Sequence, residues 1–205
     1  MKKTSAARRG FSMVELLLAL AIVSMVLTSA LVALDAAFKG YRATTDTAST
    51  HVVSRIVMHR AVAMIRNGTE FGPFPGDVLD SAQNPLTSDF IEFVSFEDED
   101  TGVRQVSRIE FRAAEAGEEF GGLWFELFTF ENGVLQGEPV EAEMIPNVED
   151  ASFVLDYDVG PRLVRATIDL LIRPNDDLDP IGVEQRNENN NEPIRLVGSA
   201  TPRRL

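Results

Sequence analysis

The sequence predicts an α+β protein in which one long N-terminal helix is packed on antiparallel β-sheets. Residues 11–34 are an almost uninterrupted apolar run, and residues 35–66 continue a helical pattern without proline. Beyond residue 68, apolar and polar residues alternate in short runs separated by turn signals. A helix-forming segment followed by a series of such strands is typical of the α+β class.

Composition and charge exclude several classes of function. The chain has 205 residues, of which 44% are hydrophobic and 25% charged, as in an ordinary globular protein. Its net charge is -13, and residues 1–10 contain four basic residues, so the remainder carries -17. A body this acidic is not expected to bind nucleic acid by neutralising phosphates. The absence of cysteine excludes disulfides, thiolate metal sites and cysteine nucleophiles.

The apolar run from Phe11 to Leu34 contains a single charged residue, Glu15. At about 1.5 Å per residue, a helix of this length crosses a bilayer core of roughly 30 Å. Basic residues precede the run, which predicts a cytoplasmic N-terminus and a body on the far side of the membrane.

Other interpretations of this segment are open. A secretory signal peptide has an apolar core of about 7–15 residues, which is shorter than this run, although residues 28–30 offer a weak cleavage site. A twin-arginine signal would use Arg8 and Arg9 but is normally less hydrophobic. A plain membrane anchor leaves Glu15 unexplained, because an ionised carboxylate in hydrocarbon costs several kcal/mol or more.

Residues 9–15, Arg-Gly-Phe-Ser-Met-Val-Glu, resemble the processing site of type IV prepilins and pseudopilins. The resemblance implies that prepilin peptidase cuts between Gly10 and Phe11 and methylates the new amino group of Phe11. It also implies a filament-assembly salt bridge, in which Glu15 meets the amino terminus of a neighbouring subunit. Two charges that are costly alone in lipid would neutralise each other there.

The helical pattern continues past the membrane-spanning run. Apolar or small residues recur there at steps of three or four, and the side that they form is expected to lie against a sheet. They are Phe38, Tyr41, Thr45, Ala48, Val52, Ile56 and Ala63 or Met64. Asn67-Gly68 predicts the end of the helix. Gly40 and the Thr44-Thr45 pair are expected positions for a bend.

The expected organisation therefore has four parts. Residues 1–10 are a prepilin leader peptide, and residues 11–34 a transmembrane helix. Residues 35–67 are the periplasmic continuation of that helix, and residues 68–205 a β-rich globular domain.

Several strands are expected in the globular domain. Residues 90–96 and 103–112 predict a hairpin around the acidic turn 97–102, and residues 123–130 a central strand. Glu131-Asn132-Gly133 predicts a turn before a return at Val134-Leu135. Phe153, Leu155 and Tyr157 form the apolar side of one strand, and Val164, Ala166, Ile168, Leu170 and Ile172 that of the next. Residues 173–193 are expected to be a mobile loop, and residues 194–197 a last strand.

Two of these stretches resemble the J-type minor pseudopilins of type II secretion systems. They are residues 146–158, which begin Pro-Asn-Val, and residues 163–172. The resemblance implies an inner-membrane, single-pass subunit whose partners are prepilin peptidase and other minor and major pseudopilins. It implies a tip complex that initiates a filament and aids protein export. A minor pilin of a type IV pilus or DNA-uptake system, and a membrane-tethered binding domain that never polymerises, are the alternatives.

No catalytic residue, metal site, cofactor or small-molecule substrate is expected. The only histidines, His51 and His59, are eight residues apart, whereas a zinc-binding helix needs a spacing of four. Acidic runs at 97–100 and 176–179 could supply oxygen ligands to calcium, but neither has EF-hand spacing.

Overall fold

The computed structural model describes residues 11–114, 119–160, 162–173 and 193–203. It confirms the predicted α+β, pilin-like architecture, because one long helix, α1 (Met13–Asn67), is followed by an antiparallel sheet. The chain divides into two compact units, Met1–Thr45 and Asp46–Leu205. The expected leader at residues 1–10 and nearly all of the loop expected at 173–193 lie outside the described residues.

Helix α1 runs without interruption through Gly40, Thr44 and Thr45, where a bend was expected. The two threonine hydroxyls donate hydrogen bonds to the backbone oxygens of Gly40 and Tyr41, both at 2.9 Å. Bonds of this kind return to the preceding turn and often bend a helix slightly without ending it. The boundary between the two compact units falls directly after Thr45.

The predicted helix end at Asn67-Gly68 is confirmed, and the structure gives it a steric reason. The N–H of Gly68 donates to the carbonyl of Met64 at 3.0 Å, which closes the last turn. A Cβ atom at this position would lie 2.5 Å from Cδ2 of Phe93, closer than two carbon atoms can approach. Glycine therefore lets the chain leave the helix directly beneath a core aromatic ring.

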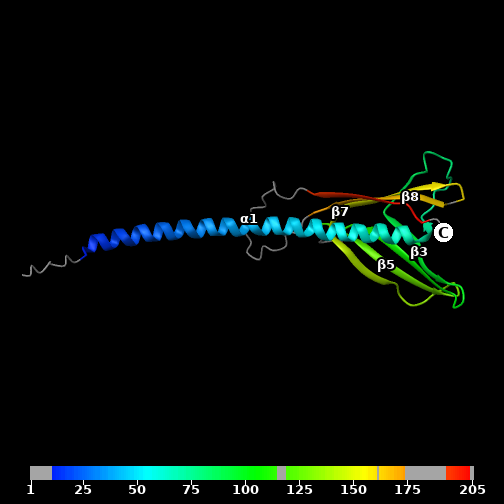
Figure 1. Ribbon diagram of the computed structural model, residues 1–205, viewed down its shortest axis with the longest axis horizontal. Coiled ribbons are helices and arrows are strands. Elements are labelled where there is room, and N and C mark those ends of the chain that lie inside the picture. Colours follow the sequence, from blue (N-terminus) through cyan, green and yellow to red (C-terminus); the bar gives the residue numbers. More distant parts are fainter. Residues whose placement is uncertain (1–10, 115–118, 161, 174–192, 204–205) are drawn as a thin grey trace, which may run out of the picture. The chain divides into compact units, whose positions relative to one another are not determined.

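Nine strands form one antiparallel sheet in the described part of the chain (Figure 1). The strands are β1 (Thr69–Gly72), β2 (Leu86–Ser88), β3 (Phe90–Asp98), β4 (Val103–Arg112), β5 (Gly121–Glu131), β6 (Val134–Leu135), β7 (Val140–Asp158), β8 (Arg162–Ile172) and β9 (Ile194–Ala200). Their order in the sheet is β1-β3-β4-β5-β7-β8-β9, while β2 pairs with β7 and β6 with β5. The predicted hairpin, the central strand, the return at Val134-Leu135 and the last strand are all confirmed.

Strand β7 has 19 residues and pairs along its length first with β5 and then with β8, while short β2 pairs with its residues Phe153–Leu155. Its first part, from Val140 to Val148, pairs with β5, and from Val148 onward it pairs with β8. The change of partner coincides with Asn147, which has a φ of 56°. Asparagine adopts this left-handed conformation at lower cost than most residues. The sequence analysis predicted the second part of β7 and missed the first.

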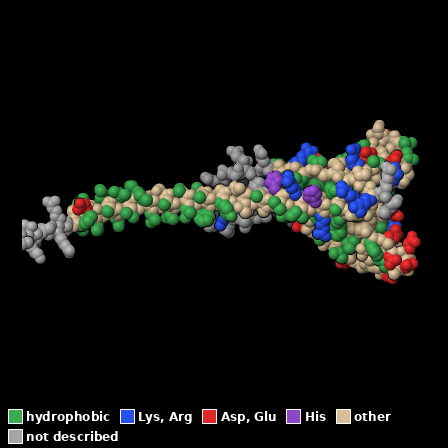
Figure 2. Space-filling model, viewed as in Figure 1, with side chains coloured by type: hydrophobic (Ala, Val, Ile, Leu, Met, Phe, Trp, Pro, Cys, Tyr) green, Lys and Arg blue, Asp and Glu red, His purple; other side chains and the backbone are tan. Residues whose placement is uncertain are grey.

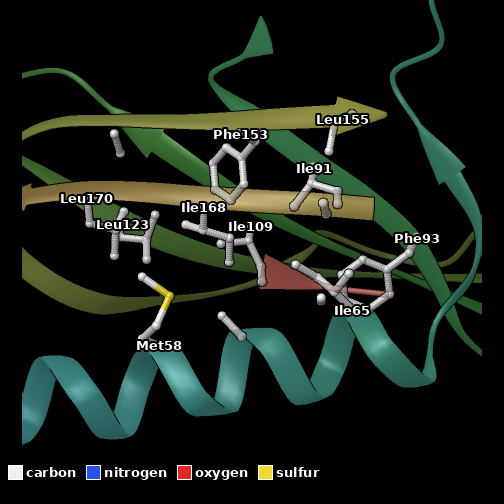
Figure 3. Close-up of a cluster of buried hydrophobic side chains, with 14 of the residues drawn as sticks. Met58, Ile65, Ile91, Phe93, Ile109, Leu123, Phe153, Leu155, Ile168 and Leu170 are labelled. Atoms are coloured by element: carbon white, nitrogen blue, oxygen red, sulfur yellow. The ribbon is translucent and has the colours of Figure 1, made fainter. Parts of the chain in front are cut away.

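The core lies between the two parts of the sheet and the second half of α1. Figure 3 shows Met58 and Ile65 of α1 directed at apolar side chains that extend from β3, β4, β5, β7 and β8. The fully buried large side chains include Phe93, Phe153, Ile91, Ile109, Leu123, Leu155, Ile168 and Leu170. Phe153, Leu155 and Tyr157 are buried as the alternation in the sequence predicted.

The buried face of α1 differs from the predicted one. Ser54, Met58, Ala61 and Ile65 face the sheet, whereas Ile56 is 62% exposed. Val52, the neighbour of Ile56 in the expected stripe, is exposed as well. The small side chains at positions 54 and 61 let the helix approach the sheet closely, and this requirement outweighs the larger apolar stripe.

One residue of β8 was also placed on the wrong side. Val164 was expected to face the core with Ala166, but it is 40% exposed and Leu163 is buried instead. The register of β7 with β8 shifts between Asp156 and Tyr157, so that Val164 has no direct partner. A β-bulge of this kind places an extra residue in one strand and reverses the alternation beyond it.

The central position of Phe153 predicts a large cost of truncation. Phe153→Ala should lower the free energy of unfolding by about 3–5 kcal/mol, because it leaves a cavity at a fully buried site. Val197→Ala, at an exposed position of β9, should change it by less than about 0.5 kcal/mol. Denaturant titration of the detergent-solubilised chain measures both values, and equal effects would contradict the assignment of the core.

Candidate functional site

The first turn of α1 carries an N-terminal capping box made by Ser12 and Glu15. The N–H of Ser12 donates to Oε2 of Glu15 at 3.1 Å, and the N–H of Val14 donates to the Ser12 hydroxyl at 3.4 Å. Both bonds satisfy backbone donors that have no partner within the helix. Within the described residues, this carboxylate accepts no other hydrogen bond. The sequence analysis missed this role, although Ser-x-x-Glu before an apolar run is its usual signature.

The residues of the expected processing site are placed as follows. Phe11 is exposed and lies just before the helix, and Glu15 is in its first turn. Gly10 lies outside the described residues. The peptide bond at which cleavage is expected, between Gly10 and Phe11, therefore lies just before a capped helix. Phe11 itself is outside the regular hydrogen-bonded turns.

The segment Met13–Arg42 of α1 is long and apolar enough to cross a membrane. The most apolar 18-residue stretch of this segment has a mean hydropathy of 2.6, and none of it is buried within the molecule. Figure 2 shows hydrophobic side chains along the visible face of this part of the helix. The segment is consistent with a single-pass membrane anchor.

A second exposed apolar group follows on α1 beyond this span. Val52, Val53 and Ile56 are each more than half exposed. They lie on turns of the helix whose opposite side is covered by the sheet. Clustered exposed side chains of this size are typical of surfaces that pack against another protein.

An ion-pair network covers the side of the sheet that faces away from the core. Arg104, Arg108 and Arg112 project from β4 at intervals of four residues and therefore share one face. Arg108 bonds Glu92 at 2.9 Å, and Arg112 bonds Glu141 at 3.0 Å. Glu126 of β5, which is only 6% exposed, forms an ion pair with Arg112 and lies 3.9 Å from Arg108.

Aromatic rings complete this network. The guanidinium of Arg108 lies 4.7 Å from the ring centroid of Phe90, and that of Arg112 lies 4.8 Å from that of Trp124. Hydrogen bonding to Glu141 raises the pKa of Arg112, so its charge is permanent. The arginines are thus held by acids and aromatic rings of this chain, and the network is a structural feature of the sheet.

Titratable groups elsewhere have structural explanations. Burial raises the pKa of Tyr157, whose hydroxyl donates to the carbonyl of Pro73 at 2.9 Å. Bonds from the Thr101 hydroxyl and the Asp100 N–H lower the pKa of Asp98 and shape the acidic turn. His51 and His59 are both exposed. The described residues contain no group of three potential metal ligands, and the acidic run at 176–179 lies outside them.

Residues 5–31 match the family model described as the prokaryotic N-terminal methylation motif. This motif is the signal of type IV pilin-like prepilins, and the match supports a type IV pilin-like protein. Such proteins are structural rather than enzymatic, and the motif implies processing by prepilin peptidase and assembly with other pilins. No curated protein and no solved structure matches the chain significantly.

Removing one arginine from the network should destabilise the sheet. Arg112→Ala leaves the buried carboxylate of Glu126 without its hydrogen-bonded partner and should cost about 2–3 kcal/mol. The estimate is lower than the roughly 3–5 kcal/mol that is usual for breaking a buried pair, because a third of the Arg112 side chain is exposed and Arg108 remains near.

A matched substitution on the same strand tests the role of burial. Arg104→Ala removes the ion pairs of Arg104 with Glu70 and Glu97, whose side chains are more exposed than that of Glu126. The variant should cost no more than about 1 kcal/mol. Thermal and denaturant unfolding measure both variants. A cost for Arg104→Ala that equals that for Arg112→Ala would show that burial of Glu126 is not the reason.

Proposed function

We propose that this chain is a minor pseudopilin of a type II secretion system, of the J-type. It is inserted in the inner membrane with a cytoplasmic N-terminus, cut between Gly10 and Phe11, and methylated at Phe11. Its β-rich domain, residues 68–205, lies in the periplasm. It then packs through its helix into a short envelope filament, within a tip complex that initiates assembly and aids protein export. The observation that carries the proposal is the methylation motif over residues 5–31, together with Glu15 as the only charged residue of the apolar run 11–34.

Glu15 gives the proposed filament its register. The carboxylate is expensive in hydrocarbon unless a cation reaches it. Its cap bond to Ser12 stabilises the helix start but supplies no positive charge. The amino group of Phe11 on an incoming subunit provides that charge, so correctly aligned neighbours are favoured over misaligned ones.

The exposed side of α1 supports a role in packing between subunits. Val52, Val53 and Ile56 are exposed on the part of the helix that the sheet covers on its other side. Neighbouring helices in a filament would remove these side chains from water, with a gain of about 25 cal/mol per Å² of apolar surface. Val52 and Ile56, which were expected to face the sheet, are thus available to other subunits.

The J-type assignment is supported by residues 146–158 and by their positions in the fold. Asn147 has the left-handed conformation at which β7 changes partner, and Val148 is buried directly after it. Phe153 and Tyr157 fill the core. The residue types in this segment therefore have a shared structural purpose, which is to guide β7 from one part of the sheet to the other.

Processing is tested by mass spectrometry of the mature N-terminus in cells that contain a prepilin peptidase. The expected terminal peptide begins at methylated Phe11, and Gly10→Val should leave the leader attached. Retention of Met1 in the wild-type protein would instead indicate a simple membrane tether and would overturn the proposal.

Two substitutions at Glu15 separate its charge from its capping role. Glu15→Ala removes both, while Glu15→Gln keeps an oxygen that can accept the Ser12 N–H bond. Both variants should be processed normally. The yield of each variant in filaments should fall about tenfold if the pair of Glu15 with the Phe11 amino group contributes about 1.4 kcal/mol. Recovery of sheared filaments followed by immunoblotting measures the yield.

Asp35→Ala provides the matched control for the loss of an acid from the same helix. Among the described residues, the one ion pair of Asp35 is with exposed Lys39, at 3.1 Å. The variant should assemble normally. Full assembly of Glu15→Gln would show that capping, rather than charge, is what the filament needs. Co-purification with pseudopilins rather than with pilus subunits would distinguish secretion from a type IV pilus or a DNA-uptake system.

A further inference from the structure

In the described part of the chain, the first part of β7 has a neighbouring strand on one side only. Residues from Val140 to Ile145 pair with β5 on one side. Strand β7 begins to pair with β8 only at Val148, beyond this segment. Among the described residues, no other strand and no backbone hydrogen bond meets the second side of this segment. An unpaired edge presents N–H and carbonyl groups that can accept another strand.

The inner face of this edge is open as well. Val140 and Ala142 point to the same side as Phe125 and Leu127 of β5, yet both are exposed. A groove of about 210 Å³ lies beside Ala142, between the edge and α1. It is lined by Val57, Arg60, Met64, Phe125, Ala142, Glu143 and Met144. The inward side chains of an added strand would meet the apolar side chains of Val57, Met64 and Phe125 in this groove, with Arg60 also in its lining.

The outer face of the edge is acidic. Glu141 and Glu143 alternate with Val140 and Ala142 and lie opposite Glu126 and Trp124 of β5. Glu141 pairs with Arg112 at 3.0 Å, but Glu143 has no ion pair within the described part of the chain. The edge therefore combines acidic residues on one face with apolar residues on the other.

We propose that this edge, Val140–Ile145, binds an extended segment of another protein in which apolar and basic residues alternate. The segment adds a strand beside β7. Its apolar side chains enter the groove next to α1, and its basic side chains meet Glu141 and Glu143. This mode of binding takes its affinity from main-chain hydrogen bonds and its selectivity from alternate side chains. The proposal does not depend on cleavage at Phe11.

The edge has features that limit indiscriminate pairing. Met144 lies in a bulge, because Leu123 pairs with Ile145 and Trp124 with Glu143. Pro146 has no backbone N–H, so the row of hydrogen-bond donors along the edge stops there. Glu141 and Glu143 repel a strand of like charge. Bulges, proline and charge are the usual protection of sheet edges against aggregation. They restrict this site to a short segment of opposite charge rather than closing it.

Hydrogen exchange of the full chain in detergent micelles tests the proposal, with synthetic peptides as the probe. A short peptide of alternating valine and lysine should slow exchange of the amides from Val140 to Ile145 that face the free edge, by about tenfold. A peptide of alternating valine and glutamate should not. A third peptide, with the same valines and lysines in two separate blocks, should not protect them either.

Substitutions locate the effect on this edge. Glu143→Lys, at an exposed position, should abolish the protection by the valine-lysine peptide, whereas Glu99→Lys in the β3–β4 turn should leave it unchanged. Successive residues of a strand direct their N–H groups to opposite sides. Of Glu141→Pro and Ala142→Pro, one variant should therefore lose stability, and the other should stay stable and lose only peptide protection.

Several outcomes would overturn the proposal. These are no protection by any peptide, equal protection by all three, or two proline variants that both bind the peptide. Protection without peptide that rises with protein concentration would assign the edge to a second copy of the chain. If the amides from Val140 to Ile145 are protected without peptide at every protein concentration, the edge would be assigned to a segment of the same chain.

Discussion

The change of partner along β7 is the constraint on which the sheet and core depend. A single strand of 19 residues holds β5 with its first part and β8 with its second, so the two parts of the sheet enclose one core. The change requires a left-handed residue at Asn147, followed at once by the buried Val148. The side chains of Phe153 and Leu155 can then meet those of Ile91 and Leu123 from the other part (Figure 3). Among the described strands, the same change leaves the first part of β7 with β5 as its one neighbour in the sheet.

The sequence predicted the fold where local pattern and tertiary environment agree. Phe153, Leu155 and Tyr157 alternate cleanly because one face of their strand is buried and the other is not. The prediction was wrong where a nonlocal contact decides. Val164 lies at a bulge that only the pairing with β7 reveals. Ile56 is exposed because the side of α1 with the small residues Ser54 and Ala61 packs against the sheet instead. The first part of β7 was missed because Glu141 and Glu143 lower its apparent strand character.

The N-terminal site was more accessible to prediction than the sheet, because its chemistry is local in sequence. An acid five residues after a glycine, at the start of an apolar run, defines the motif without any tertiary contact. The capping box is equally local and depends on a spacing of three. The outer-face network is different. Glu126 is buried beside Arg112, and these residues are 14 apart in sequence, so only the register of β4 with β5 brings them together.

The exposed apolar side chains on α1 and the open edge of β7 have a common physical cause in the described part of the body. One face of α1 is used by the core, so Val52 and Ile56 remain on the other; one edge of β7 is used by β5, so the second remains open. In a protein that acted alone, both would be costs, since exposed apolar clusters and free edges favour aggregation. In a pilin-like subunit they have a use, because assembly needs surfaces that stay unsatisfied until a partner arrives. A helix face can be covered by copies of the same helix, whereas an acidic strand edge is not complementary to itself. The edge therefore calls for a partner of different chemistry from the one that covers the helix.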